Sequence, residues 1–78
     1  MTKAQFEALM PIMVSDLAGM IARERSIPEE EAVMLLYRSK LYADLADEET
    51  KVWHYSTPML YTLFDEELRT GKIEYPDV

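Results

Sequence analysis

The residues with the clearest potential for chemistry lie in one short segment, Trp53-His54-Tyr55-Ser56. His54 is the only histidine, and a histidine near a serine suggests a general base paired with a nucleophile. Residues so close in sequence rarely reach that geometry, and the chain has neither a glycine-rich elbow nor a second histidine to complete a catalytic site. We therefore predict no catalytic residues and a protein that is not an enzyme.

The same segment offers a binding alternative. Trp53, His54 and Tyr55, together with Tyr37 or Tyr42, present aromatic faces and one imidazole that a small molecule or a metal ion could use. The structural interpretation is an ordered loop whose aromatic rings close the bottom of a small core. Both interpretations stay open at the level of the sequence.

Two acidic runs, Glu29-Glu30-Glu31 and Asp47-Glu48-Glu49, supply carboxylates of the kind that hard cations bind. Neither run has the spacing of a calcium loop, and the chain lacks the Glu-x-x-His pair of di-iron helix bundles. There is no cysteine for a structural zinc site. We expect no metal site and no cofactor; the first run suits the positive end of a helix, and the second suits a solvated turn.

Glu67 is a candidate for a structural polar pair. Viewed down the axis of a C-terminal helix, the angular position of Glu67 falls between those of Leu60 and Leu63, in the middle of the apolar face. A carboxylate there needs a partner. Lys40 has a comparable position on the preceding helix. We predict a Lys40–Glu67 pair that holds two helices in register; the alternative is that Glu67 reaches solvent from near the helix end.

Three main helices are expected to position these residues. The first, over 3–25, begins with a capping box of Thr2 and Gln5, and Pro11 inside it predicts a kink or a restart near residue 10. Apolar side chains recur along it at gaps of four and three: Phe6, Met10, Met13, Leu17 and Met20.

The other two helices have clear start signals. Ser26-Ile27-Pro28-Glu29 predicts a helix over 28–45 that breaks or bends near Ser39, and Thr57-Pro58 predicts one over 58–70 that ends at Gly71. Between them, Val52–Tyr55 is expected to form an ordered aromatic loop or a single strand-like segment. The predicted fold is thus one all-α domain over 1–78, a bundle of three main helices with a tail at 71–78.

The unbroken apolar run Ala32–Tyr37 points side chains all the way round its helix, so it needs cover on several sides. A chain of 78 residues without cysteine has few elements to supply that cover, and it buries only about 63% of its unfolded surface. We therefore expect a homo-oligomer or a protein partner. The residues predicted to form the interaction surface are Met13, Leu17, Met20, Met34, Leu35, Tyr42 and Tyr61.

Charge limits the other partners. A net charge of −7 would repel nucleic acid and anionic membranes, so neither is expected as a partner. No apolar stretch has the length of a membrane span, and the N-terminal residues lack the features of a signal peptide. These features predict a cytoplasmic protein.

One pattern carries a family resemblance. It consists of Glu30-Glu31-Ala32, Tyr37-x-Ser39-x-x-Tyr42-x-x-Leu45-x-Asp47-x-x-Thr50, Trp53-x-x-Ser56, Leu60 and Glu67-Leu68. The pattern resembles a group of small uncharacterised bacterial helical proteins that are encoded beside toxin-like ADP-ribosyltransferase domains. The resemblance implies an accessory or antitoxin-like regulator of a neighbouring gene product, and it attaches no catalytic residues. The predicted function is a protein–protein interaction module, with the aromatic segment 53–55 as the alternative binding site.

Overall fold

The computed structural model describes residues 2–76, which form helices, turns and connections with no β-strand among them. In chain order the elements are α1 (Lys3–Arg25), α2 (Glu29–Tyr37), α3 (Lys40–Leu45), the 3-10 turns η1 (Glu48–Thr50) and η2 (Val52–His54), and α4 (Thr57–Thr70). The prediction of an all-α fold is confirmed. The helix expected over 28–45 is divided into α2 and α3, and the segment around Trp53 is a 3-10 turn and not strand-like.

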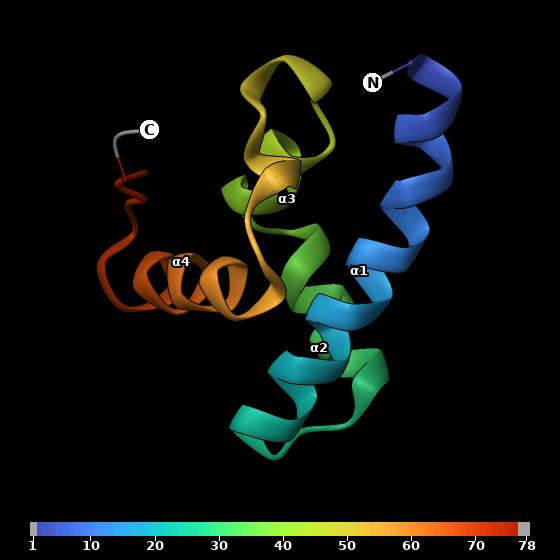
Figure 1. Cartoon of the computed structure of the whole chain (residues 1–78). Helices are drawn as coiled ribbons and strands as arrows, with labels where there is room; N and C mark the ends of the chain where they lie inside the picture. The colour runs from blue at the N-terminus through green and yellow to red at the C-terminus, as the bar shows by residue number, and fades with distance from the viewer. Residues whose placement is uncertain (1, 77–78) are drawn as a thin grey trace.

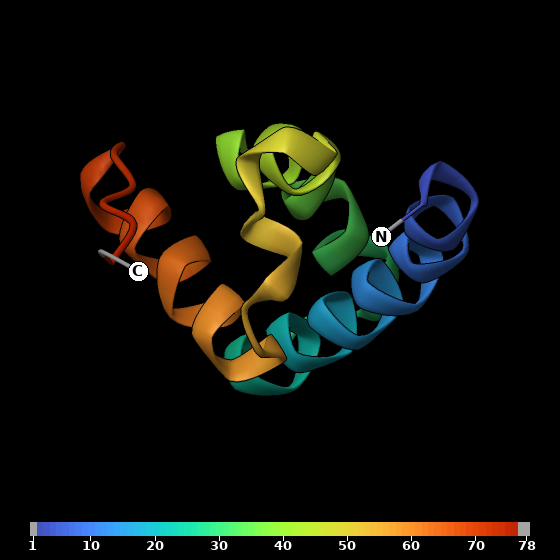
Figure 2. The same ribbon diagram turned by 45° about the horizontal axis from the view of Figure 1, so that its top comes forward.

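The helices surround a core that lies where α1, α2 and α4 meet. Figure 1 shows α2 along the lower part of α1, and in Figure 2 α1 and α4 diverge from a shared region with α3 and the 3-10 turns between them. The fully buried side chains come from every α-helix: Leu17, Ala18, Ile21, Ala32, Leu36, Leu41, Leu45, Leu60, Leu63, Phe64. An ion pair of 3.2 Å between Arg25 and Asp65 joins α1 to α4 at the edge of this core.

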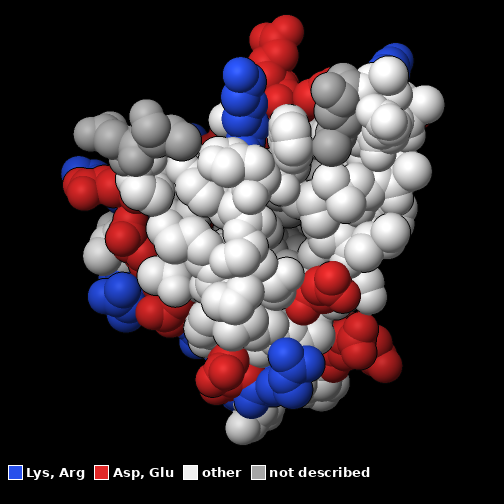
Figure 3. Space-filling model, viewed as in Figure 1, with Lys and Arg blue, Asp and Glu red and all other residues white. Residues whose placement is uncertain are grey.

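Charged side chains gather at the margins of the face seen in Figure 3, while uncharged side chains cover most of its centre. Acidic side chains project at the top of this view, where Figure 1 places η1. No helix between residues 2 and 76 combines the length and the apolar character that a membrane span requires.

Helix α1 begins as predicted and ends differently. The capping box is present: Gln5 N donates to Thr2 Oγ1 at 3.1 Å, and Thr2 N donates to Gln5 Oε1 at 2.9 Å. The helix runs through Pro11 without a restart, and the Glu7 carbonyl that loses its donor there belongs to an exposed residue that water can reach.

Ser26, the first residue of the predicted start signal for the helix over 28–45, instead closes α1. It adopts the left-handed conformation with φ 55°, and its own N–H and that of Ile27 both donate to the Ala22 carbonyl. Helix α2 then starts at Glu29 with Pro28 before it and with no side-chain cap. Because a serine can serve either end of a helix, the sequence signal placed a boundary here but assigned it to the wrong helix.

The break between α2 and α3 falls at Ser39, where the sequence predicts it. The Ser39 hydroxyl donates to the Leu36 carbonyl at 2.6 Å and accepts from Tyr42 N at 3.0 Å. One buried side chain thus ends α2 and begins α3. Only one face of the apolar run on α2 is covered: Ala32 and Leu36 are fully buried, whereas Met34 and Tyr37 are each 52% exposed.

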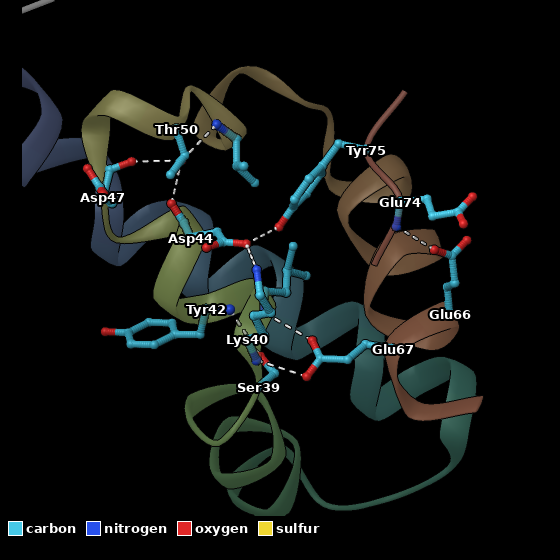
Figure 4. A network of polar contacts seen from close by, with 12 residues as sticks. Ser39, Lys40, Tyr42, Asp44, Asp47, Thr50, Glu66, Glu67, Glu74 and Tyr75 are labelled. Atoms are coloured by element: carbon cyan, nitrogen blue, oxygen red, sulfur yellow. Dashed lines mark hydrogen bonds and ion pairs between the residues drawn. The ribbon is translucent and has the colours of Figure 1, made fainter. Parts of the chain in front are cut away.

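The carboxylate of Glu67 caps α3 from outside. Its two oxygens accept from Lys40 N at 2.8 Å and from Leu41 N at 3.0 Å (Figure 4). The Lys40 ammonium instead donates to Asp44 at 3.1 Å within α3. The predicted Lys40–Glu67 side-chain pair is therefore wrong in its chemistry: the carboxylate binds backbone N–H groups, which a helix start leaves without intrahelical acceptors.

The C-terminal segment returns to the body of the protein. Gly71 ends α4 with φ 77°, and the Glu74 N–H then donates to the Glu66 carboxylate at 2.8 Å. Ile73 and Tyr75 pack against the core. The predicted tail over 71–78 is therefore ordered through Pro76, and residues 77 and 78 lie outside the described residues.

Replacing Glu67 should destabilise the fold far more than replacing Lys40. Glu67→Ala removes both acceptors from the first turn of α3, and we expect a loss of about 2 kcal/mol in the free energy of unfolding by urea. Lys40→Ala removes one exposed i,i+4 ion pair and should change it by no more than about 0.5 kcal/mol. In the double-mutant cycle the two effects should add; a coupling above about 1 kcal/mol would show that the ammonium is the true partner.

Candidate functional site

A groove of about 1040 Å³ runs between the N-terminal half of α1 and the segment formed by α2, α3 and η1. One wall is a single face of α1, whose lining residues are Lys3, Phe6, Glu7, Met10, Pro11, Val14 and Ser15. Their spacing alternates between three and one, which keeps them on one side of a helix for more than three turns. The wall is therefore continuous, and its middle is apolar.

The opposite wall consists of one stripe of α2 followed by residues of α3. Glu29, Val33 and Tyr37 are four residues apart on α2, and the wall continues with Tyr42 on α3 and Ala46 directly after it. The rings of Tyr37 and Tyr42 meet with centroids 4.8 Å apart and planes tilted by 52°. This aromatic pair bridges the break at Ser39, so the wall stays unbroken although the helix does not.

Phe6 closes one part of the groove against the core. It is 7% exposed, and its ring meets the edge of Trp53 with centroids 6.5 Å apart. Met10, Val14 and Val33 are half-buried in the same groove. The groove is therefore lined with fixed side chains and remains open to solvent.

The rim of the groove is acidic. Five of its lining residues carry carboxylates, Glu7, Glu29, Asp47, Glu48 and Glu49, whereas Lys3 is the single cation among them. Lys3 lies 4.0 Å from Glu7 at an exposed site, where an ion pair contributes little. Among residues 2–76, no salt bridge engages the other four carboxylates. The groove therefore combines an apolar interior with an edge of uncompensated negative charge.

A second, smaller cavity of about 410 Å³ lies beside the C-terminal segment. Asp44 is its hub: its carboxylate accepts from Tyr75 Oη at 2.5 Å and from Lys40 Nζ at 3.1 Å, and its backbone carbonyl accepts from Thr50 Oγ1 at 2.5 Å (Figure 4). Burial, followed by this hydrogen bond, raises the pKa of Tyr75 well above its usual value. A phenol that stays protonated is a donor and not a base, so the network fastens the C-terminal segment to α3.

The predicted interaction residues separate into three groups. Leu17 is fully buried in the core, so the prediction that it forms part of an interaction surface is wrong; the face of α1 that carries it packs inside the molecule. Met34 is exposed outside the groove, and Tyr42 lines the groove. Met13, Leu35 and Tyr61 are half-buried and pack against the core, and Met20 is half-buried.

The aromatic segment is engaged in local contacts. Trp53 Nε1 donates to the Glu48 carbonyl at 2.9 Å, His54 Nδ1 contacts the Lys51 carbonyl, and Tyr55 Oη donates to the Pro76 carbonyl at 3.4 Å. Ser56 caps α4 by accepting from Met59 N at 3.3 Å. No group of three or more His, Cys, Asp or Glu side chains within residues 2–76 is placed to hold a metal ion. The polar atoms of Trp53, His54 and Ser56 thus hold the connection between α3 and α4, whereas the Tyr55 hydroxyl contacts the C-terminal segment.

The sequence interpretation missed the groove itself. Its apolar lining includes Phe6, Met10, Val14, Val33 and Tyr37, of which Phe6 and Met10 belong to the apolar stripe that the sequence predicts for the first helix. A signal was present, because Phe6, Met10 and Val14 repeat every four residues beside the stripe that continues to Leu17. Periodicity identifies an apolar face, but it cannot show whether another element of the same chain covers that face.

Comparisons of this chain with models of protein families, with curated proteins and with solved structures find no match. The role of the groove is therefore inferred from its own geometry and charge. The features that bear on that role are the facing apolar walls, the open side and the acidic rim.

Tyr75→Phe should reduce stability at neutral pH and less so in alkali. The variant loses one hydrogen bond to Asp44, and we expect about 1 kcal/mol less free energy of unfolding at pH 7. Because the raised pKa in the folded state means that the unfolded chain ionises first, the contribution of Tyr75 is complete below about pH 10 and is lost as the pH rises through the folded-state pKa. The difference between wild type and variant should therefore shrink above pH 10 in urea titrations.

Tyr61→Phe is the matched control for removing a hydroxyl, since the described residues give Tyr61 no hydrogen-bond partner. It should change the free energy of unfolding at pH 7 by less than about 0.5 kcal/mol. An equal loss in both variants would mean that the contact between Tyr75 and Asp44 contributes nothing to the fold.

Proposed function

We propose that this chain is a protein-interaction module and that the groove between α1 and α2 binds a segment of its partner. The observation that carries the proposal is that two apolar helix faces stand opposite each other and remain open on the folded chain. Covering such a groove removes apolar surface from water, which is the main driving force of protein association. A role in binding, without a catalytic step, agrees with the local structural use of His54 and Ser56.

The exposed side chains around the groove support the same role. Tyr37 is 52% exposed on its wall, and aromatic residues of this kind are enriched at protein interfaces. Its ring is held by Tyr42, so little side-chain freedom would be lost on binding. A partner would find this anchor already in place.

Two kinds of partner belong to this proposal: a second copy of the chain, as the apolar run Ala32–Tyr37 predicts, and a different protein. The resemblance in the pattern from Glu30 to Leu68 supports the second kind, because it implies a product of a neighbouring gene and an accessory or antitoxin-like role. In either case the surface that we propose is the groove, and Tyr42 is the sequence-predicted interaction residue that lines it.

Tyr37→Ser should weaken partner binding strongly, whereas Met34→Ser should preserve it. The two residues are equally exposed on α2, each at 52%, but only Tyr37 lines the groove. The wild-type chain and each full-length variant are used to recover partners from the native host. Each recovered protein is then purified and titrated by calorimetry against the wild-type chain and both variants. We expect the dissociation constant for a true partner to rise at least tenfold with Tyr37→Ser and by less than twofold with Met34→Ser.

Sedimentation velocity of the wild-type chain and both variants covers the case of a second copy. A dimer that Tyr37→Ser dissociates and Met34→Ser preserves would also place association at the groove. Binding that responds to Met34→Ser and not to Tyr37→Ser would move the interaction surface away from the groove and refute the proposal.

A further inference from the structure

We infer that the groove accepts a basic amphipathic α-helix from another protein, with apolar side chains at its centre and Lys or Arg toward both ends. This inference rests on the proposed function and names the chemistry of the partner. It follows from three features: the length and shape of the walls, the backbone groups that the walls offer, and the position of the charges.

The walls have the dimensions of a helix site. The lining residues of α1 extend from Lys3 to Ser15, which at a rise of 1.5 Å per residue corresponds to about 18 Å, or three turns of a partner helix. Both walls are helix faces with side chains repeating every three or four residues. A third helix can pack onto two such faces through the same ridges and grooves that pack helices within a domain.

An extended peptide is a poorer occupant. The walls are built from α1, α2 and α3, whose backbone N–H and C=O groups are largely paired within their own helices. A strand laid against them would bury its backbone polar groups beside Met10, Val14 and Val33 without partners. A helix pairs its backbone internally, so only its side chains need to match the groove.

Charge selects a basic helix. Negative side chains stand at both ends of the groove: Glu7 and η1 lie near the start of α1, and Glu29 lies near the start of α2, at the opposite end (Figure 1). Between them the lining is apolar or aromatic except for Ser15. Lys or Arg residues at both ends of a bound helix would meet these carboxylates, and opposite charges at the rim also accelerate association.

A second copy fits these charges badly. Each copy carries a net charge of −7, and four of its eight basic residues, Lys3, Arg25, Lys40 and Arg69, already pair with acids of the same chain. Two copies joined at this rim would bring carboxylates together. A different protein whose helix carries excess positive charge can match both the apolar walls and the acidic ends of the groove.

The test uses a display library of random 14-residue peptides selected against the immobilised full chain. We expect enriched peptides to have net positive charge and apolar residues spaced i, i+3 or i+4, i+7, and to become helical on binding by circular dichroism. The best peptide is then titrated against the wild type, against Tyr37→Ser and against Met34→Ser, at low and high salt. Loss of binding with Tyr37→Ser alone, together with weaker binding in high salt, supports the inference.

Two matched charge variants test the rim. The first combines Glu29→Gln, Glu48→Gln and Glu49→Gln; the second makes the same change of net charge outside the groove with Glu24→Gln, Glu31→Gln and Glu74→Gln. The dissociation constant of the basic peptide should rise at least tenfold with the first variant and less than threefold with the second. Equal effects would mean that only the overall charge matters, and the inference would fail.

The remaining outcomes separate the inference from the proposed function. Selected peptides that are neutral or acidic, or a dimer of the chain that Tyr37→Ser dissociates, would overturn the basic helix while leaving the groove as the binding surface. Enriched peptides that ignore Tyr37→Ser, or no enrichment together with a monomer in sedimentation, would overturn both.

Discussion

The structure depends on one carboxylate that acts across the fold, that of Glu67 on α4. By accepting from the N–H groups of Lys40 and Leu41 it satisfies the start of α3, and Ser39 satisfies the next N–H. A helix of six residues has little stability of its own, so its position is set by these caps and by burial of Leu41 and Leu45. The direction of α3 in turn places Tyr42 in the groove wall and Asp44 under the C-terminal segment.

Helix α1 serves two purposes along its length. Its C-terminal half carries Leu17, Ala18 and Ile21 into the core, whereas in its N-terminal half Phe6 is the one buried residue. This half of the helix is therefore held by Phe6 against Trp53 and by the half-buried side chains of Met10, Met13 and Val14. A domain this small cannot cover every apolar face, and the uncovered stretch of α1 is what forms a wall of the groove.

Local signals made the ends of several helices predictable, whereas contacts between distant parts of the chain could not be predicted. The capping box at Thr2, the break at Ser39 and the ending at Gly71 depend on a few neighbouring residues, and the structure has each of them. The partner of Glu67 depended on which backbone lies across from it, and a pattern of side chains carries no information about that. The groove was hidden for a similar reason, since Met10 and Val14 have the same character whether a helix of this chain covers them or not.

The fold requires some of the carboxylates at the rim of the groove and not others. Glu29 lies in the first turn of α2, where its negative charge interacts favourably with the positive end of the helix dipole. Asp47 caps η1 by accepting from Glu49 N at 3.0 Å. The fold itself therefore accounts for these two acids. Glu48 and Glu49 use only their backbones in the described contacts, through the Glu48 carbonyl and the Glu49 N–H. Basic or uncharged polar side chains at these two positions would keep that turn solvated equally well. The fold therefore does not require their negative charge beside an apolar groove, and this charge agrees with the basic partner that we propose.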